Sequence, residues 1–348
     1  GFDAERLDRL STHLDKYVDG GLLPGVNILV SRAGKIVYRH MYGARDIERS
    51  LPVAADTIYR FYSMTKPITS IAIMQLYEKG LFQLKDPISR WIPSFANSQV
   101  FVGGDAIDPQ TRDANREISI HDLLTHTSGL TYHFHMVHAV DEMYRRAGFD
   151  WTKSPGDLEN QCNVLASLPL LFDPGTEWNY SYSTDVVGRL VEVMSGLTLN
   201  SYLERNIFEP LGMVDTGFSV SNGKEERFAS CYYPNSQTKQ ATLLDDAQRS
   251  PYLREPEAFS GGGGLVSTLG DYHRFTQALR NGGCLEGKRI IGRKTLEFMT
   301  SNHLPGGVDL TEYGRPLFSE TAYDGVGFGL GFSVVVDPVK AQVLSQKG

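Results

Sequence analysis

The sequence has little cysteine and no long hydrophobic run, and each shortage narrows the kind of protein that it encodes. Only 3 cysteines occur, far apart at Cys162, Cys231 and Cys284. An odd number at such spacing indicates free thiols and argues against a disulfide framework. No apolar stretch reaches the roughly 18 residues that a membrane-spanning helix needs. We therefore expect neither a membrane partner nor a disulfide scaffold, and the free thiols favour a cytoplasmic location.

Concentrated positive charge and the usual ligand-binding glycine loops are also missing. The 34 lysines and arginines are spread along a chain of net charge -7, so the sequence contains no basic cluster of the kind that binds nucleic acid. The closest approach to a G-x-G-x-x-G loop begins at Gly325 and has Leu330 where the third glycine belongs. No serine lies in a G-x-S-x-G elbow. Nucleic-acid binding, a dinucleotide cofactor and an α/β-hydrolase elbow are therefore not expected.

The pattern of the N-terminal part predicts a mixture of helices and strands. Leucines at helical spacing indicate an amphipathic helix over residues 3–18. Residues 25–31 and 35–42 are rich in β-branched and aromatic side chains, which predicts an antiparallel hairpin around 32–34. Residues 69–77 are apolar almost all round, which predicts a buried helix that Gly80 closes.

The remaining pattern predicts a sheet that is divided by a helical insertion. Strand signals are few over residues 83–262, and they return at 264–267. Near the C-terminus, residues 325–336 and 339–344 predict two strands joined at Asp337-Pro338. We predict an α/β (α+β) fold, with an antiparallel sheet flanked by helices and interrupted by a mostly helical domain. The predicted domains comprise residues 1–82 with 263–348, and residues 83–262.

The first candidate for chemistry is the segment from Ser63 to Lys66, which has the form S-x-x-K. Side chains three residues apart lie on one face of a helix, so a hydroxyl nucleophile and an amine base come within hydrogen-bond reach. A helix start also offers unpaired backbone N–H groups, which makes the Ser63 N–H a candidate donor to an oxyanion. The alternative interpretation is a helix cap followed by a solvated lysine.

A second candidate is the aromatic segment 174–182, which contains Tyr180 and Tyr182. Tyrosine is a weak base at its ordinary pKa of about 10, but a nearby ammonium lowers that pKa by stabilising the phenolate. Lys66 is a candidate for the ammonium. The alternative is a tyrosine that only packs, with its hydroxyl hydrogen-bonded. Spacing along the chain does not choose between these alternatives.

Several segments, in this order, resemble the serine β-lactamase-like superfamily, which includes class C β-lactamases, D-alanyl-D-alanine peptidases and family VIII carboxylesterases. The matching segments are residues 63–66, 123–130, 174–182, 210–213 and 262–265. The resemblance implies a β-lactamase/transpeptidase-like fold that needs no metal or organic cofactor. It aligns Ser63 with the nucleophile, Lys66 with its partner and Tyr180 with the tyrosine of a Y-x-N motif.

The third position of that motif departs from the pattern, because Tyr182 stands where relatives that recognise penicillin-like amides have asparagine. Tyrosine lacks the amide that both donates and accepts hydrogen bonds. The looser motif resembles the carboxylesterase branch. A further motif, K-T-G or a variant such as W-G-G, is expected on a strand after Gly348, so the chain is expected to be incomplete there and the second oxyanion donor stays unassigned.

The segment 132–143 contains a cluster of histidines at positions 133, 135 and 138. It lacks the H-E-x-x-H and Cys/His spacings of metal sites, so we expect no metal there. Its mixture of aromatic and polar residues instead favours a segment that lines or covers a substrate cleft. Tyr132, His133 and Tyr182 are the predicted substrate-binding residues.

The predicted function is a serine carboxylesterase that hydrolyses short-chain esters through an acyl-enzyme on Ser63. The expected partner is a small-molecule ester, with a β-lactam as the alternative. The alternatives that stay open are a β-lactamase or D-amino-acid peptidase, an acyltransferase that uses the same acyl-enzyme, and a catalytically silent binding or sensor protein. The natural substrate and the oligomeric state do not follow from the sequence.

Overall fold

The computed structural model describes residues 2–150, 154–315 and 323–347, and the chain divides into two compact units. The first unit contains residues 1–62, 208–256 and 264–281, and the second contains residues 63–207, 257–263 and 282–348. The boundaries of these units differ from those of the predicted domains. The division predicted at residues 82 and 262 therefore stays a prediction.

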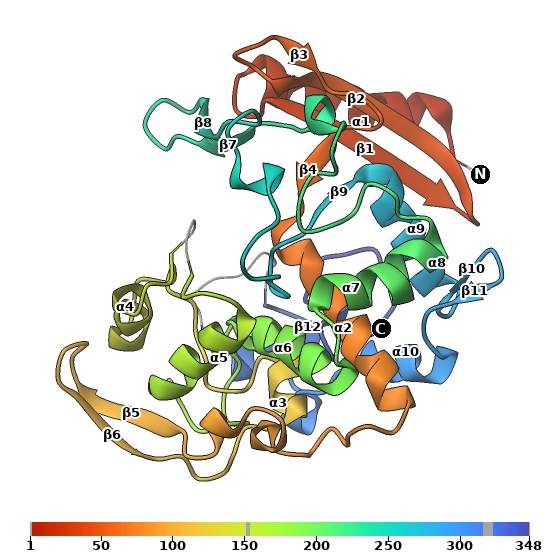
Figure 1. Ribbon diagram of the computed structural model, residues 1–348. Helices are drawn as coiled ribbons and strands as arrows, with labels where there is room; N and C mark the ends of the chain where they lie inside the picture. The colour runs from red at the N-terminus through yellow and green to blue at the C-terminus, as the bar shows by residue number, and fades with distance from the viewer. Residues whose placement is uncertain (1, 151–153, 316–322, 348) are drawn as a thin grey trace. The chain divides into compact units, whose positions relative to one another are not determined.

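The first unit begins with a helix on a three-stranded antiparallel sheet of order β1-β2-β3 (Figure 1). The helix is α1 (Ala4–Asp19), and the strands are β1 (Gly25–Arg32), β2 (Lys35–Asp46) and β3 (Leu51–Pro52). Asp3 caps α1 by accepting backbone hydrogen bonds from its first turn. The predicted helix and hairpin are both confirmed.

The rest of the first unit is held by a small apolar core. Its buried members are Ile58, Val220, Phe228, Ala247 and Val266. The elements are β4 (Ile58–Arg60) paired with β9 (Val266–Thr268), β7 (Cys231–Pro234) paired with β8 (Ala241–Asp245), α8 (Glu209–Leu211), α9 (Leu269–Arg280), and short 3-10 turns at Glu225–Arg227 and Pro251–Leu253. The strand predicted at 264–267 is therefore present, as β9.

The second unit is organised around a buried helix, α2 (Thr65–Glu78), which packs against α6 (Ser183–Ser195) (Figure 1). Ile68, Ile71 and Ile73 are fully buried on α2. Burying side chains of this size stabilises a fold by about 1.5–3 kcal/mol each. Gly80, at φ +73°, follows the end of the helix. The predicted buried helix is confirmed, and it provides a rigid support for the S-x-x-K segment.

The other elements of the second unit are mostly short. They are the helices α3 (Ile120–Leu124), α4 (Ala139–Arg146), α5 (Leu158–Ser167), α7 (Leu199–Leu203), α10 (Arg293–Met299) and α11 (Leu310–Tyr313), a π-helix at Glu204–Phe208, 3-10 turns at Ile88–Arg90, Pro93–Phe95 and Pro305–Gly307, and the strand pairs β5 (Gln99–Gly104) with β6 (Pro109–Asp113), β10 (Cys284–Leu285) with β11 (Lys288–Arg289) and β12 (Val326–Phe328) with β13 (Ser333–Val335).

The secondary structure confirms the predicted fold class, a mixture of helices and antiparallel strands. Every named strand pair in the described part of the chain is antiparallel. The region predicted to be poor in strands nevertheless contains the hairpins β5–β6 and β7–β8. Among the described residues, no helix combines the length and the apolar character needed to cross a membrane.

The C-terminal strand pair differs from the prediction. Residues 325–336 form both strands of the hairpin β12–β13 rather than one strand, and residues 339–344 form turns. The chain reverses at Gly331, which has φ +87°, and the Gly329 N–H donates to the Phe332 carbonyl at 2.7 Å. Only glycine adopts such a backbone at no steric cost. Past the hairpin, hydrogen bonds from Ala341 and Val343 back to residues 337 and 338 form turns in place of the second strand.

Candidate active site

Ser63 lies in a short 3-10 turn, Tyr62–Met64, which leads directly into α2. Its side chain is partly exposed. Tyr62, the residue before it, has φ +43°, a left-handed conformation that costs a non-glycine residue roughly 1–2 kcal/mol. Backbone strain of this kind gathers at functional sites, where the surrounding fold maintains it. Local geometry therefore presents the Ser63 hydroxyl at the start of a buried helix.

Lys66 is the first of two side chains that contact the Ser63 hydroxyl. It is only 6% exposed, and its Nζ donates to Ser63 Oγ at 3.2 Å and to the Gly262 carbonyl at 2.7 Å. The ammonium also lies 4.4 Å from the ring centre of Tyr180 and 5.3 Å from that of Tyr132. Aromatic faces attract a cation at these distances. Lys66 is thus a buried amine directed at Ser63, and the interpretation as a solvated lysine is wrong.

Tyr180 is the second contact, and its hydroxyl donates to Ser63 Oγ at 2.5 Å. It comes from the segment before α6, 117 positions along the chain from Ser63. The Tyr180 ring packs 5.1 Å from the His126 ring and 6.3 Å from the Trp178 ring, centre to centre. This packing belongs to an apolar core that includes Trp178 and Phe328. The structure therefore brings Ser63, Lys66 and Tyr180 together.

The predicted substrate-binding residues have different surroundings. The Tyr132 ring lies 5.4 Å from the Tyr180 ring, beside the Lys66 ammonium. Tyr182 is 9% exposed, and its hydroxyl is paired with His133 Nδ1 at 2.6 Å. Burial lowers the pKa of His133 to about 4 and raises the pKa of the Tyr182 phenol. Tyr132 borders the candidate site, whereas the hydroxyl of Tyr182 is engaged by His133. A role in substrate binding stays a prediction for all three.

The other histidines of this region have structural contacts. The Nδ1 atom of His138 accepts the Val140 N–H at 3.1 Å and so caps α4, and the Nδ1 atom of His135 is 3.2 Å from the Thr131 hydroxyl. His126 is buried with its Nδ1 atom 3.1 Å from the Ser181 hydroxyl, and burial holds its pKa well below the ordinary range. In the described ranges, no group of at least three His, Cys, Asp or Glu side chains is arranged to hold a metal ion.

Two residues that were not predicted as functional adjoin Lys66. The first is Gly262, whose carbonyl accepts the lysine hydrogen bond, and its signal in the sequence was the glycine run 261–264. The second is Asp185, a buried carboxylate on α6 that accepts the Gly262 N–H at 3.2 Å. In the sequence, Asp185 could have been noticed as an acidic residue within an otherwise apolar stretch of predicted helix. No contact assigns the oxyanion donors, so the Ser63 N–H stays a prediction in that role.

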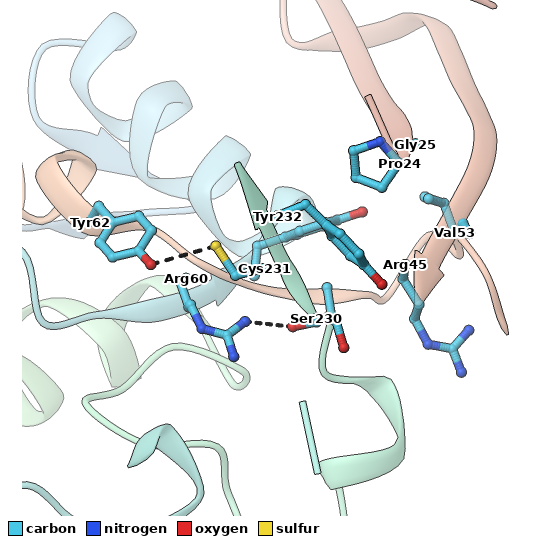
Figure 2. Close-up of a pocket in the computed structure, with 12 residues that line it drawn as sticks. Pro24, Gly25, Arg45, Val53, Arg60, Tyr62, Ser230, Cys231 and Tyr232 are labelled. Atoms are coloured by element: carbon cyan, nitrogen blue, oxygen red, sulfur yellow. Dashed lines mark hydrogen bonds between the residues drawn. The ribbon is translucent and has the colours of Figure 1, made fainter. Parts of the chain in front are cut away.

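The first unit contains a separate cavity of about 210 Å³, which Figure 2 shows in close-up. Several of its polar lining groups have hydrogen-bond partners, some within the lining and some outside it. The Tyr62 hydroxyl is 3.6 Å from Cys231 Sγ, and the Arg60 guanidinium is paired with Asp245 at 2.5 Å. All three cysteines are free, as predicted. The lining residues among the described positions include no lysine, so this cavity does not provide a serine–lysine pair.

Comparisons with known proteins agree with this geometry. The family model described as Beta-lactamase matches residues 10–341. Protein Rv1367c of Mycobacterium tuberculosis is 35% identical over 345 residues, which cover 98% of this chain and 82% of that protein. Esterase EstB of Burkholderia gladioli is 33% identical over 296 residues, which cover 78% of this chain and 70% of that protein.

A solved structure is similar over nearly the whole chain. It is that of EstCE1, described as a hydrolase with promiscuous acyltransferase activity, with a TM-score of 0.80 and 25% identity. The match covers 99% of this chain and 86% of that one. Together with the family match over most of the sequence, this similarity confirms the resemblance that the motifs predicted. The chain belongs to the beta-lactamase family.

Proposed function

We propose that this protein is a serine hydrolase that cleaves carboxylic esters through an acyl-enzyme on Ser63. The observation that carries the proposal is the pair of hydrogen bonds to Ser63 Oγ, from Lys66 Nζ at 3.2 Å and from the Tyr180 hydroxyl at 2.5 Å. A serine hydroxyl is a weak nucleophile unless an adjacent group accepts its proton. The family and the esterase EstB among its relatives support the same reaction class.

In the proposed acylation step, Ser63 Oγ attacks the carbonyl carbon of the ester. Loss of the Tyr180 phenol proton gives a phenolate that the Lys66 ammonium stabilises; this phenolate accepts the serine proton and then gives it to the departing alkoxide. The products of this step are an alcohol and an acyl ester on Ser63. An ammonium beside the Tyr180 ring stabilises the phenolate, and burial of Lys66 strengthens that electrostatic effect.

Deacylation uses the same proton-transfer groups, with a water molecule in place of Ser63 as the nucleophile. A water molecule gives a proton to the Tyr180 phenolate and attacks the acyl carbon, and the same proton then passes to Ser63 Oγ, which releases a carboxylic acid and restores the Ser63 hydroxyl. Groups of the protein itself supply the nucleophile and the proton transfers, so the proposed reaction needs neither a metal nor an organic cofactor. The partner is thus a small-molecule ester.

Tyr182 favours an ester over a lactam as the substrate. An asparagine at this position would offer an amide that donates and accepts hydrogen bonds, whereas the hydroxyl of Tyr182 is paired with His133 at 2.6 Å. Acyl transfer to an alcohol is the second candidate reaction, because the similar EstCE1 is described as having promiscuous acyltransferase activity. That reaction differs only in the acceptor that attacks the acyl-enzyme.

The proposal is tested by comparing rates on a p-nitrophenyl ester, a chromogenic cephalosporin and a D-Ala-D-Ala peptide. We expect the highest kcat/KM for the ester, and loss of that activity in Ser63→Ala. Adding a primary alcohol and measuring the new ester separates transfer from hydrolysis. Full ester hydrolysis by Ser63→Ala contradicts the proposal, and a higher kcat/KM for the cephalosporin or peptide contradicts the assignment as an esterase.

A further inference from the structure

A buried carboxylate is hydrogen-bonded to the residue whose carbonyl accepts the Lys66 ammonium. Asp185, in the first turn of α6, is 3% exposed. One of its carboxylate oxygens accepts the Ser260 hydroxyl at 2.5 Å and the Gly262 N–H at 3.2 Å. The Gly262 carbonyl accepts the Lys66 ammonium at 2.7 Å. The Gly262 residue is therefore held by Asp185 through its N–H and contacts Lys66 through its C=O.

Gly261 and Gly262 pack too closely on the helices for a side chain to fit without a shift of the surrounding atoms. A Cβ atom on Gly262 would lie 2.4 Å from the second oxygen of Asp185 and 3.0 Å from the Tyr132 hydroxyl. A Cβ atom on Gly261 would lie 2.6 Å from the Thr184 carbonyl. The Thr69 hydroxyl of α2 also donates to the Gly261 carbonyl at 2.9 Å. Contacts from α2 and α6 thus fix the position of this segment.

Burial of a carboxylate is unfavourable unless hydrogen bonds and a nearby positive charge compensate it. Burial raises the pKa of Asp185, while its hydrogen bonds and the charge of Lys66 act in the opposite direction. An apolar side chain at this position would need no such compensation. Unlike an apolar side chain, the carboxylate accepts hydrogen bonds from the Ser260 hydroxyl and the Gly262 N–H.

We propose that Asp185 is a positioning residue for the reaction of Ser63. It fixes the turn from Ser260 to Gly262, and the Gly262 carbonyl in turn keeps the Lys66 amine directed at Ser63 Oγ. This inference rests on the proposed function, since it assigns Asp185 to the geometry of the same site. Asp185 acts through Gly262, so it is a positioning residue and not a catalytic one.

The test uses Asp185→Ala, Asp185→Asn and a matched control, Asp271→Asn. Asp271 is a buried carboxylate on α9 of the first unit, and it likewise accepts one backbone N–H, from Asp215 at 2.7 Å, and one hydroxyl, from Thr216 at 2.9 Å. Burial raises its pKa too. The readouts are the rate and final stoichiometry of Ser63 labelling by a p-nitrophenyl phosphonate, with thermal unfolding measured for each variant.

We expect Asp185→Ala to slow labelling by about 10- to 100-fold while it still reaches full stoichiometry, because a displaced catalytic group reduces rate without removing the nucleophile. Asp185→Asn keeps an oxygen acceptor and should label within about threefold of the parent rate. Asp271→Asn should lower the unfolding temperature without slowing labelling. Ser260→Ala, which removes one of the two hydrogen bonds, should be slowed less than Asp185→Ala.

Labelling of Asp185→Ala at the parent rate would overturn the inference, and so would an Asp185→Asn variant as slow as Asp185→Ala. If Asp185→Ala does not fold, Ser260→Ala is used in its place. Labelling of Ser260→Ala at the parent rate would likewise overturn the inference. Failure of the parent protein to be labelled at Ser63 contradicts the proposed function instead. The two failures are therefore distinguishable.

Discussion

At the scale of single residues, two neighbouring tyrosines have hydroxyl groups with different partners. Tyr180 donates to Ser63 Oγ, and Tyr182 is paired with His133. We predict that Tyr180→Phe lowers kcat for a p-nitrophenyl ester by about 10²- to 10⁴-fold, because it removes a proton-transfer group but keeps the ring that packs on His126. Tyr182→Phe is the comparison variant: the Tyr182 hydroxyl is paired with His133, so a role in substrate binding predicts a change in KM and not a loss of kcat comparable to that of Tyr180→Phe. A Tyr180→Phe enzyme with parent kcat would contradict the role of Tyr180.

His133 makes stability depend on pH. Burial lowers its pKa to about 4 in the folded protein, whereas an unfolded chain binds the proton near pH 6.5. Between those values the unfolded state holds more protons, so the free energy of unfolding decreases as the pH falls from about 6.5 to about 4. We predict that His133→Gln reduces this decrease, measured by urea unfolding at several pH values. Parallel pH curves for the two proteins would show that His133 contributes nothing to it.

The residues of the candidate site differ in how far the sequence could predict them. Ser63 and Lys66 are three positions apart, and helical geometry alone predicts their contact. Tyr180 is 117 positions away and was identified only through the resemblance to a family. The pairing of Tyr182 with His133 and the role of Asp185 depend on how distant segments pack, so no local pattern contained them.

At the scale of elements, the hairpin β1–β2 has an unfavourable residue in its turn. Ala33 and Gly34 have φ +50° and +77°, as a tight type I′ connection requires. Alanine is strained there, while asparagine tolerates this conformation better. We predict that Ala33→Asn stabilises the protein by roughly 0.5–1 kcal/mol, measured by urea unfolding.

Gly34→Ala is the opposite control for this turn. A Cβ atom on Gly34 would meet no other atom within 4 Å, so only the backbone conformation opposes the substitution. The expected loss is about 1–2 kcal/mol. A decrease in stability for Ala33→Asn, or no change for Gly34→Ala, would contradict this description of the turn.

Elements with a clear periodicity were predictable, and glycine-rich ones were not. The leucine spacing of α1 and the apolar run of α2 correspond to helices in the structure. Glycines at alternate positions from 325 to 331 look like one interleaved strand, but Gly331 at φ +87° reverses the chain within it. A sequence does not state which glycine adopts a positive φ, because that depends on the tertiary contacts of the turn.

At the scale of the whole molecule, the proposed reaction uses only groups of the protein itself. We predict that dialysis against a chelator leaves ester hydrolysis unchanged, since Ser63, Lys66 and Tyr180 supply the nucleophile and the proton transfers. The check is the rate on a p-nitrophenyl ester before and after treatment. A loss of activity that is restored by adding a divalent metal would contradict a metal-free mechanism.

The central claim for the molecule is that Ser63 carries the acyl group during turnover. The direct measurement is mass spectrometry of the acid-quenched enzyme during hydrolysis of a p-nitrophenyl ester, followed by peptide mapping. We predict an increase in mass equal to the acyl group on the peptide that contains Ser63, and no such increase in Ser63→Ala. An acyl group on another residue, or unchanged turnover in Ser63→Ala, would contradict the claim.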